Sequence, residues 1–262
     1  MPEENQPVVV SRPKLRVALI HNHDAGRLAH IRPALAGLGD ATLTEVSEQP
    51  PLAAQTWPML VWRKMLAWRL QRRWRAYREQ PQYFLPLDLL RLPRDIWRAR
   101  DRTKGQIEIY LSDKHTRAWR DFLGSNDNAL LVLEDDAVFR PDTALGLGEA
   151  LALLDERPAY LDLAGGFPRA ALGVERLEAA RTGRFIEYRK PVTNTTAGYL
   201  INRALAGKLV GMLDANPRWN LFTADWMLNR CFVEGLDARC FHAEPTIFVH
   251  GSHAGTYSST LM

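Results

Sequence analysis

The sequence is poor in the features that mark disulfide-rich, membrane-spanning or repeat proteins. Its 262 residues include only two cysteines, Cys231 and Cys240. Their spacing matches no metal-binding signature, and we expect both to be reduced residues of the core rather than a disulfide. No apolar run approaches the ~20 residues needed to cross a bilayer. The remaining composition, 46% hydrophobic and 24% charged residues, is typical of a globular protein.

The first residues also lack the pattern of a secretion signal. Residues 1–14 predict a flexible tail, and their acidic, polar start has neither a basic nor an apolar region. We therefore expect a cytoplasmic protein, associated at most peripherally with the inner face of the cytoplasmic membrane. The length allows residues 15–262 to form a single domain, which we expect.

Positive charge is concentrated in one segment of the chain. The net charge is +4, but residues 62–104 carry thirteen Lys and Arg against four Asp and Glu. Residues 57–78 show helical periodicity with interleaved tryptophans, whereas residues 81–104 predict an irregular loop. A basic helix of this kind favours an anionic membrane surface. The alternative is a helix packed on the domain with a solvated basic face.

The rest of the pattern alternates between strands and helices. Short apolar runs predict strands, and apolar residues at helical spacing predict helices. The predicted strands are 15–20, 41–46, 129–133, 159–163, 195–201 and 247–249. The predicted helices are 27–38, 112–123, 142–154, 203–213 and 222–234. The β-α-β opening favours an α/β architecture, in which ligands bind at the ends of strands.

The strongest chemical signal is Glu134-Asp135-Asp136, directly after an apolar run. Mutual repulsion of three acids at a strand end is costly unless a cation is present. Carboxylate oxygens suit Mg²⁺ or Mn²⁺. Because side chains alternate along a strand, Glu134 and Asp136 point to the same side, and one or both could hold the metal. An acidic turn or a helix cap is the alternative.

Several other candidates stand next to predicted strands. His250 follows the last predicted strand and could reach a phosphate or the metal, and His253 is a weaker candidate. Gly165-Gly166 follows another strand and allows close approach of a sugar or diphosphate to the backbone. Asp162 is a further candidate beside these glycines. A surface or core role is the alternative for each histidine.

Asp225 lies among apolar neighbours at the start of a predicted helix. Burial would raise its pKa and make it a better proton acceptor. The alternative is a helix cap, a position for which Thr223 competes. His115, considered alone, predicts a residue that packs its helix against the domain.

The order of three segments resembles a known family. Gly105-Gln106-Ile107, Tyr110-Leu111-Ser112, His115 and Trp119 echo a Gly-Glu-Ile-Gly-Cys-x-Leu-Ser-His stretch that precedes a Trp. Residues 129–136 match a strand that ends in Glu-Asp-Asp, and residues 195–201 resemble a Thr-x-Ala-Tyr-Leu-Ile segment. These motifs are similar to those of glycosyltransferase family 25, the lipooligosaccharide-type and collagen galactosyltransferases. Asp225 falls where that family carries an Asp in its next helix.

Two departures from the family pattern are visible. Glu108 and Ile109 stand in place of Gly-Cys, and Asp113-Lys114 intervene between Ser112 and His115. Residues 57–100 match no motif of the family.

The resemblance implies a GT-A-like fold, a mixed α/β sheet flanked by helices, with residues 57–104 as a basic helical insertion. It implies an inverting, metal-dependent and galactosyltransferase-like hexosyl transfer, as in lipopolysaccharide biosynthesis. The implied donor is a nucleotide sugar, a UDP-sugar, and the acceptor is a hydroxyl of a lipid-linked or surface oligosaccharide or polysaccharide. An anionic membrane surface is a further expected partner, and nucleic acid is not.

The resemblance also implies roles for particular residues. Asp225 would be the catalytic base, and His115 would position the reacting groups. The implied ligands of Mn²⁺ or Mg²⁺ are Glu134, Asp136 and His250. The residues expected to contact the nucleotide sugar are Asp135, Asp136, Thr196, Gly165 and Gly166.

Two other functions remain open on the residues alone. The acidic cluster would also serve a metal-dependent phosphotransferase or phosphoesterase. The basic segment would also serve a non-enzymatic module that binds membranes or nucleic acid.

Overall fold

The computed structural model describes residues 14–47 and 102–258. The strands are β1 (Leu15–Ile20), β2 (Thr42–Val46), β3 (Ala129–Glu134), β4 (Ala137–Phe139), β5 (Ala159–Asp162), β6 (Glu178–Thr182), β7 (Phe185–Tyr188), β8 (Gly198–Asn202), β9 (Arg239–Ala243) and β10 (Phe248–His250). The helices are α1 (Ala25–Ala36), α4 (Arg102–Leu123), α5 (Thr143–Ala152), α6 (Arg169–Leu172), α7 (Arg203–Ala215) and α8 (Ala224–Val233), with short 3₁₀ turns at η1 (Glu175–Leu177) and η2 (Pro217–Leu221).

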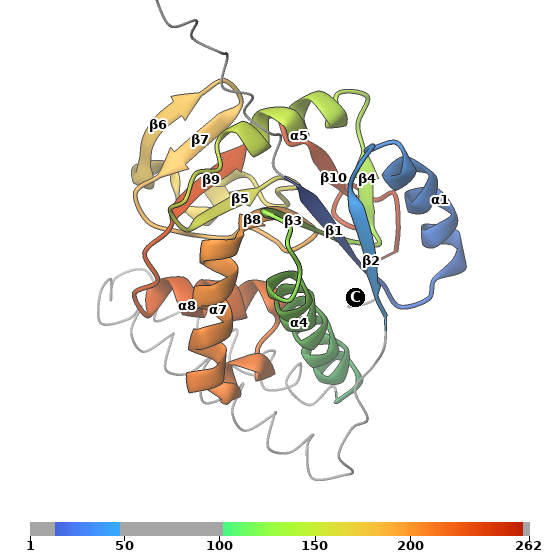
Figure 1. Cartoon of the computed structure of the whole chain (residues 1–262), viewed down its shortest axis with the longest axis horizontal. Helices are drawn as coiled ribbons and strands as arrows, with labels where there is room; N and C mark the ends of the chain where they lie inside the picture. Colours follow the sequence, from blue (N-terminus) through green and yellow to red (C-terminus); the bar gives the residue numbers. More distant parts are fainter. Residues whose placement is uncertain (1–13, 48–101, 259–262) are drawn as a thin grey trace, which may run out of the picture.

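The strands form an eight-stranded mixed sheet in the order β2-β1-β3-β8-β5-β9-β7-β6, while β10 and β4 pair separately. Helices cover both faces of the large sheet (Figure 1). This arrangement confirms the predicted α/β class, a mixed sheet flanked by helices.

The same direction is shared by β1, β2, β3, β5 and β9, which lie in the main part of the sheet, and by the edge strand β6. β1 is parallel to β2 and β3, and β5 is parallel to β9. The antiparallel β8 lies between β3 and β5, so these two strands are parallel to each other. The carboxyl ends of these strands therefore meet at one edge of the sheet, where open α/β sheets bind their ligands.

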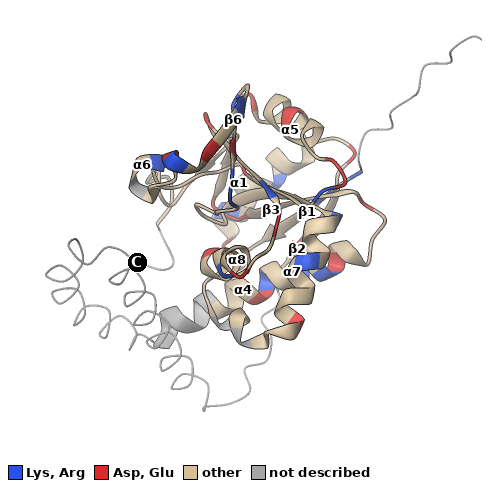
Figure 2. Ribbon diagram, turned by 90° about the vertical axis from the view of Figure 1, so that its left-hand side faces the viewer, with Lys and Arg blue, Asp and Glu red and all other residues tan. Residues whose placement is uncertain are grey.

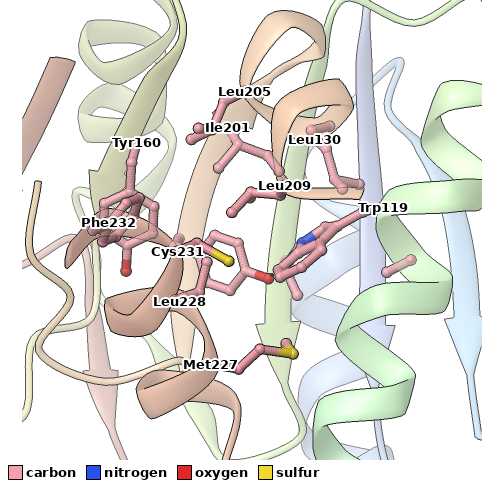
Figure 3. Packing of buried hydrophobic residues seen from close by; sticks show 14 of the residues in the cluster. Trp119, Leu130, Tyr160, Ile201, Leu205, Leu209, Met227, Leu228, Cys231 and Phe232 are labelled. Carbon is pink, nitrogen blue, oxygen red and sulfur yellow. Dashed lines mark hydrogen bonds between the residues drawn. The ribbon is translucent and has the colours of Figure 1, made fainter. Parts of the chain in front are cut away.

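Successive side chains of β3 point to opposite faces of the sheet and contribute to two separate hydrophobic cores. Leu130 and Val132 pack with α4, α7 and α8 on one face, a cluster that Figure 3 shows around Trp119. Leu131 and Leu133 pack with α1 and α5 on the other face. A strand buried on both faces reads as a continuous apolar run, which is why the sequence predicted it well.

The largest difference from the predicted elements is in α4. The helix begins at Arg102, ten residues before the predicted start, so the end of the predicted 81–104 loop is helical. β8 begins at Gly198 rather than at 195, because residues 195–197 form a loop before the strand. Strands β4, β6, β7 and β9 were not predicted. In β6 the reason is that its residues are exposed and carry no apolar pattern.

Cys231 and Cys240 are both free and buried, as predicted. Basic and acidic residues are interspersed on the described part of the chain, including along α4 and α7 (Figure 2). The predicted basic helix 57–78 and residues up to 101 lie outside the described residues. In the described ranges, no helix is both long enough and apolar enough to span a membrane.

Candidate active site

The predicted acids lie at the ligand-binding edge of the sheet. Glu134 is the last residue of β3, and Asp135 and Asp136 form the turn into β4. All three side chains make contacts, but with different partners. Each therefore has a different chemical environment, although they are adjacent in sequence.

Asp135 forms a buried ion pair with Arg27 of α1. The Arg27 Nη1 to Asp135 Oδ1 distance is 2.8 Å, and both residues are less than a tenth exposed. The N-cap Asp24 accepts hydrogen bonds from the backbone of Gly26 and Arg27, which fixes the start of the helix. The Asn22 backbone N–H also donates to Asp135. Asp135 is thus held by the protein itself.

A buried lysine lies beside this pair. Lys114 is 1% exposed, and its Nζ donates to the carbonyl of His21 at 2.6 Å and to the side chain of Asn22. Burial lowers the pKa of Lys114, an effect that the charge of Asp135 opposes. Sequence reasoning assigned no role to Arg27 or Lys114. The signal for Lys114 was its place in the segment that departs from the family motif.

Glu134 receives hydrogen bonds from two side chains. Thr196 Oγ1 donates to Glu134 Oε1 at 2.6 Å, and His115 Nε2 lies 3.3 Å from the same oxygen. His115 is fully buried on α4. The structure therefore brings three predicted site residues together, and His115 is more than a packing residue.

The tautomer of His115 follows from its other partners. Trp119 Nε1 donates to the Tyr199 hydroxyl at 2.9 Å, because an indole N–H can only donate. Burial raises the pKa of Tyr199 well above its usual value, so the hydroxyl keeps its proton. That proton points to His115 Nδ1, 2.8 Å away. If His115 Nδ1 accepts the hydroxyl proton of Tyr199, the proton of the neutral ring is on Nε2. Nε2 can then donate to Glu134.

Asp136 pairs with His250 across the β4–β10 ribbon. His250 Nε2 lies 3.2 Å from Asp136 Oδ2, and Ser252 donates to the same oxygen. Burial opposes both charges, yet the pairing prevails: it raises the pKa of His250 and lowers that of Asp136. The backbone N–H of Gly251 donates to the Asp136 carbonyl. In this turn an added Cβ at Gly251 would collide with that carbonyl and with Tyr257, which explains the glycine.

Two polar atoms of this pair are buried without a hydrogen-bond partner among the described residues. They are Asp136 Oδ1 and His250 Nδ1. A carboxylate oxygen and an imidazole nitrogen are both metal-ligand atoms, so the pair fits a divalent cation. Within the described ranges, however, no three His, Cys, Asp or Glu side chains gather closely enough to hold a metal. The structure does not join Glu134 to this pair, and its role as a ligand stays a prediction.

Asp225 lies in the first turn of α8. Thr223 occupies the N-cap position and its hydroxyl donates to Asp225, so Asp225 is not the cap. Burial raises the pKa of Asp225, and the negative charge of Glu134 adds to the rise. A raised pKa is what a general base at neutral pH requires.

A pocket of about 360 Å³ opens at the ends of β5 and β9. Its lining includes the predicted Gly165, Gly166 and Asp162, together with His250 and His253. His253 stacks on His250 with ring centroids 4.3 Å apart. The structure thus places these residues beside the Asp136–His250 pair, because His250 is part of the pocket lining.

Comparison with known proteins gives a distant likeness. No protein-family model matches the chain, and no curated protein matches it. The chain is similar to the crystal structure of a glycosyltransferase involved in the glycosylation of the major capsid of PBCV-1. The TM-score is 0.40 and the identity 13%, with 93% of this chain and 96% of that chain covered. The resemblance to family 25 stays a prediction.

Proposed function

We propose that the protein is a metal-dependent glycosyltransferase that moves a sugar from a nucleotide-sugar donor to an acceptor hydroxyl. The observation that carries the proposal is the Asp136–His250 pair, with its two unpartnered ligand atoms at the carboxyl edge of the sheet. Two protein ligands suit Mg²⁺ or Mn²⁺ when the substrate's phosphates supply others. A diphosphate leaving group fits that requirement.

The residues around the Asp136–His250 pair would each have a role in the transfer. A divalent cation at Asp136 and His250 would neutralise the charge that develops on the departing diphosphate. Arg27 and Lys114 add positive charge on the β1 side of the edge, although Asp135 neutralises part of it. Glu134, which is held by His115 and Thr196, would bind a hydroxyl of the donor.

The acceptor hydroxyl must lose a proton as it attacks. Asp225 is our choice for the base, because burial raises its pKa and its hydrogen bond from Thr223 fixes its orientation. In a single in-line displacement the attacking oxygen forms its bond to the anomeric carbon as the bond to the diphosphate breaks, and Asp225 takes the proton. The configuration of the sugar is then inverted.

The finer assignments rest on the family 25 resemblance. They are a UDP-sugar donor, galactosyl-like transfer and a lipid-linked or surface polysaccharide acceptor. A site of action at the inner face of the cytoplasmic membrane depends on the basic segment 57–104, most of which lies outside the described residues. Vesicle sedimentation with anionic lipid tests that part independently of catalysis.

The proposed function is tested by a thermal-shift screen of nucleotide sugars with Mn²⁺. A ligand that binds the native state raises the melting temperature, so the correct donor should stand out. Asp136→Asn should abolish that shift and lower turnover by roughly a thousandfold, since metal stabilisation of a leaving group contributes several kcal/mol. The matched control is Asp214→Asn, which alters an exposed acid paired with Arg120.

Two results would count against the proposal. Stabilisation by no nucleotide sugar, combined with phosphate release from simple esters, would favour the metal-dependent phosphoesterase. Full donor stabilisation in Asp136→Asn, or in the presence of a chelator, would remove the metal from the account.

A further inference from the structure

The pocket beside His250 is bounded by a loop that the protein holds rigidly. Asp162 accepts hydrogen bonds from the backbone of Gly165 at 2.8 Å and of Asn194 at 3.0 Å. The Asn194 side chain in turn accepts from the Phe167 N–H and donates to the Phe167 carbonyl, at 2.9 and 2.8 Å. An added side chain at Gly166 would collide with Thr195. The loop therefore has little freedom to rearrange.

This rigid loop exposes a large aromatic side chain to the pocket. Phe167 is 50% exposed, although its backbone is fixed on both sides. The ring meets His253 edge-on, with centroids 4.7 Å apart, and His253 stacks on His250. A continuous series of contacts thus joins the Phe167 ring to the Asp136–His250 pair. What distinguishes Phe167 from the other exposed apolar side chains is that it lines this pocket, where an aromatic face is the kind of surface that small-molecule sites use.

The chemistry of the lining indicates what that ligand is. Among the described lining residues, the charged groups are Asp162, Glu244 and Arg169. Arg169 already forms ion pairs with Glu244 and Glu178. The pocket thus offers no uncompensated cation for a phosphate or carboxylate. An apolar ring face combined with carboxylate, amide and imidazole groups suits an uncharged molecule rich in hydroxyls, and the volume is that of a small-molecule site.

We propose that this pocket is the subsite for an uncharged sugar ring of the acceptor, which stacks its C–H face on Phe167. The proposal rests on the proposed function and extends it by naming the class of acceptor. The charged diphosphate of the donor would bind at Asp136 and His250, and the acceptor ring would bind in the pocket at the ends of β5 and β9. Gly165 and Gly166, which the sequence analysis assigns to the donor, would then line the acceptor subsite. Asn194 is a positioning residue, because it acts through the Phe167 backbone.

The test is saturation-transfer NMR on the full chain with lactose, maltose and glucuronate as probes, in the presence of UDP and Mn²⁺. We expect transfer to the ring protons of the neutral disaccharides and little transfer to glucuronate. Phe167→Ala should weaken binding about tenfold, whereas Phe167→Tyr, which keeps the ring, should restore it. Leu145→Ala is the matched control, since it truncates another exposed apolar side chain, on α5.

The outcomes separate this proposal from the proposed function. Neutral-sugar binding that survives in Phe167→Ala, or a preference for glucuronate, would overturn the acceptor subsite. A calorimetric titration of UDP with Mn²⁺ in the same preparations reports the donor site. If UDP binds and no sugar does, the subsite fails and the transferase remains; if sugars bind through Phe167 and UDP does not, the transferase fails.

Discussion

The surroundings of Asp135 and those of Asp136, on the two sides of the turn after β3, differ in how their polar groups are paired. On the first side, Asp135 is paired with Arg27, and Lys114 donates to two acceptors. His21 Nε2, which has no hydrogen bond among the described residues, lies 3.4 Å from a carboxylate oxygen of Glu45. On the second side, Asp136 and His250 each keep a buried polar atom without a described partner. Phe167 is exposed there beside a pocket.

This difference indicates that the first group of residues mainly stabilises the fold and that the second mainly binds a ligand. A buried polar group without a partner is unfavourable, and native proteins tolerate it mainly where a ligand completes the site. We therefore expect substitutions in the Asp135–Arg27 pair to lower the free energy of unfolding. Substitutions of Asp136 and His250 should lower ligand binding or turnover, with a smaller loss of stability.

The largest expected effect comes from the proposed base. Asp225→Asn should lower sugar transfer by roughly 10²–10⁴-fold, the usual size of general-base loss, with donor affinity unchanged. Turnover and calorimetric titration of the nucleotide sugar in one preparation check this. A parallel loss of donor affinity would make Asp225 a donor-binding residue, and unchanged turnover would move the base elsewhere.

Among the ion pairs of α1, the buried Arg27–Asp135 pair should contribute most to the free energy of unfolding. Arg27→Met leaves Asp135 buried without its cation and should lower the free energy of unfolding by about 3 kcal/mol or more. Arg32→Met is the control on the same helix, because the Arg32–Glu45 pair is largely exposed and should contribute less than about 1 kcal/mol. Urea unfolding measures both. Equal effects would contradict the distinction between the two pairs.

A smaller loss of stability is expected when the hydrogen bonds that join Trp119, Tyr199 and His115 are broken. Tyr199→Phe removes the hydroxyl that joins Trp119 to His115 and leaves two buried groups without partners. The free energy of unfolding should fall by roughly 1–3 kcal/mol. Urea unfolding with Tyr199→Phe checks this, and a change below about 0.5 kcal/mol would show that these bonds are not important for folding.

The smallest effect is a pH dependence of metal-free stability. The pKa of His250 is raised in the folded protein by its hydrogen bond to Asp136, against the effect of burial. The stability from this pair is therefore complete below the unfolded pKa of about 6.5 and is lost as pH rises through the folded value. Melting temperatures of wild type and His250→Gln should converge between pH 5 and 9. A constant difference would mean that the pairing is not ionic.

Much of the fold could be predicted from the sequence because the central strands are buried on both faces. The run at Ala129–Leu133 identified β3, and helical spacing identified α1, α5, α7 and α8 to within a few residues. The edge strand β6 carries no such pattern, since its residues are exposed. Its place in the sheet comes from pairing with β7, which a local pattern does not encode.

The site was only partly predictable, for a related reason. Strand-end acids and a histidine after a strand can be found locally, and the structure brings Asp136 and His250 together. Arg27, the buried partner of Asp135, comes from α1 and is 108 residues away in sequence. The buried Lys114 comes from α4 and bonds to the loop after β1. Phe167 was not predicted, because only the hydrogen bonds from Asn194 distinguish it from any other exposed aromatic residue.

The most direct test of the central claim is Mn²⁺ binding followed by electron paramagnetic resonance, with and without UDP. The account predicts that UDP tightens Mn²⁺ binding, because the diphosphate supplies ligands that Asp136 and His250 do not. Asp136→Asn should weaken that binding at least tenfold, and Asp214→Asn should not change it. Equal Mn²⁺ affinity in wild type and Asp136→Asn would contradict the account.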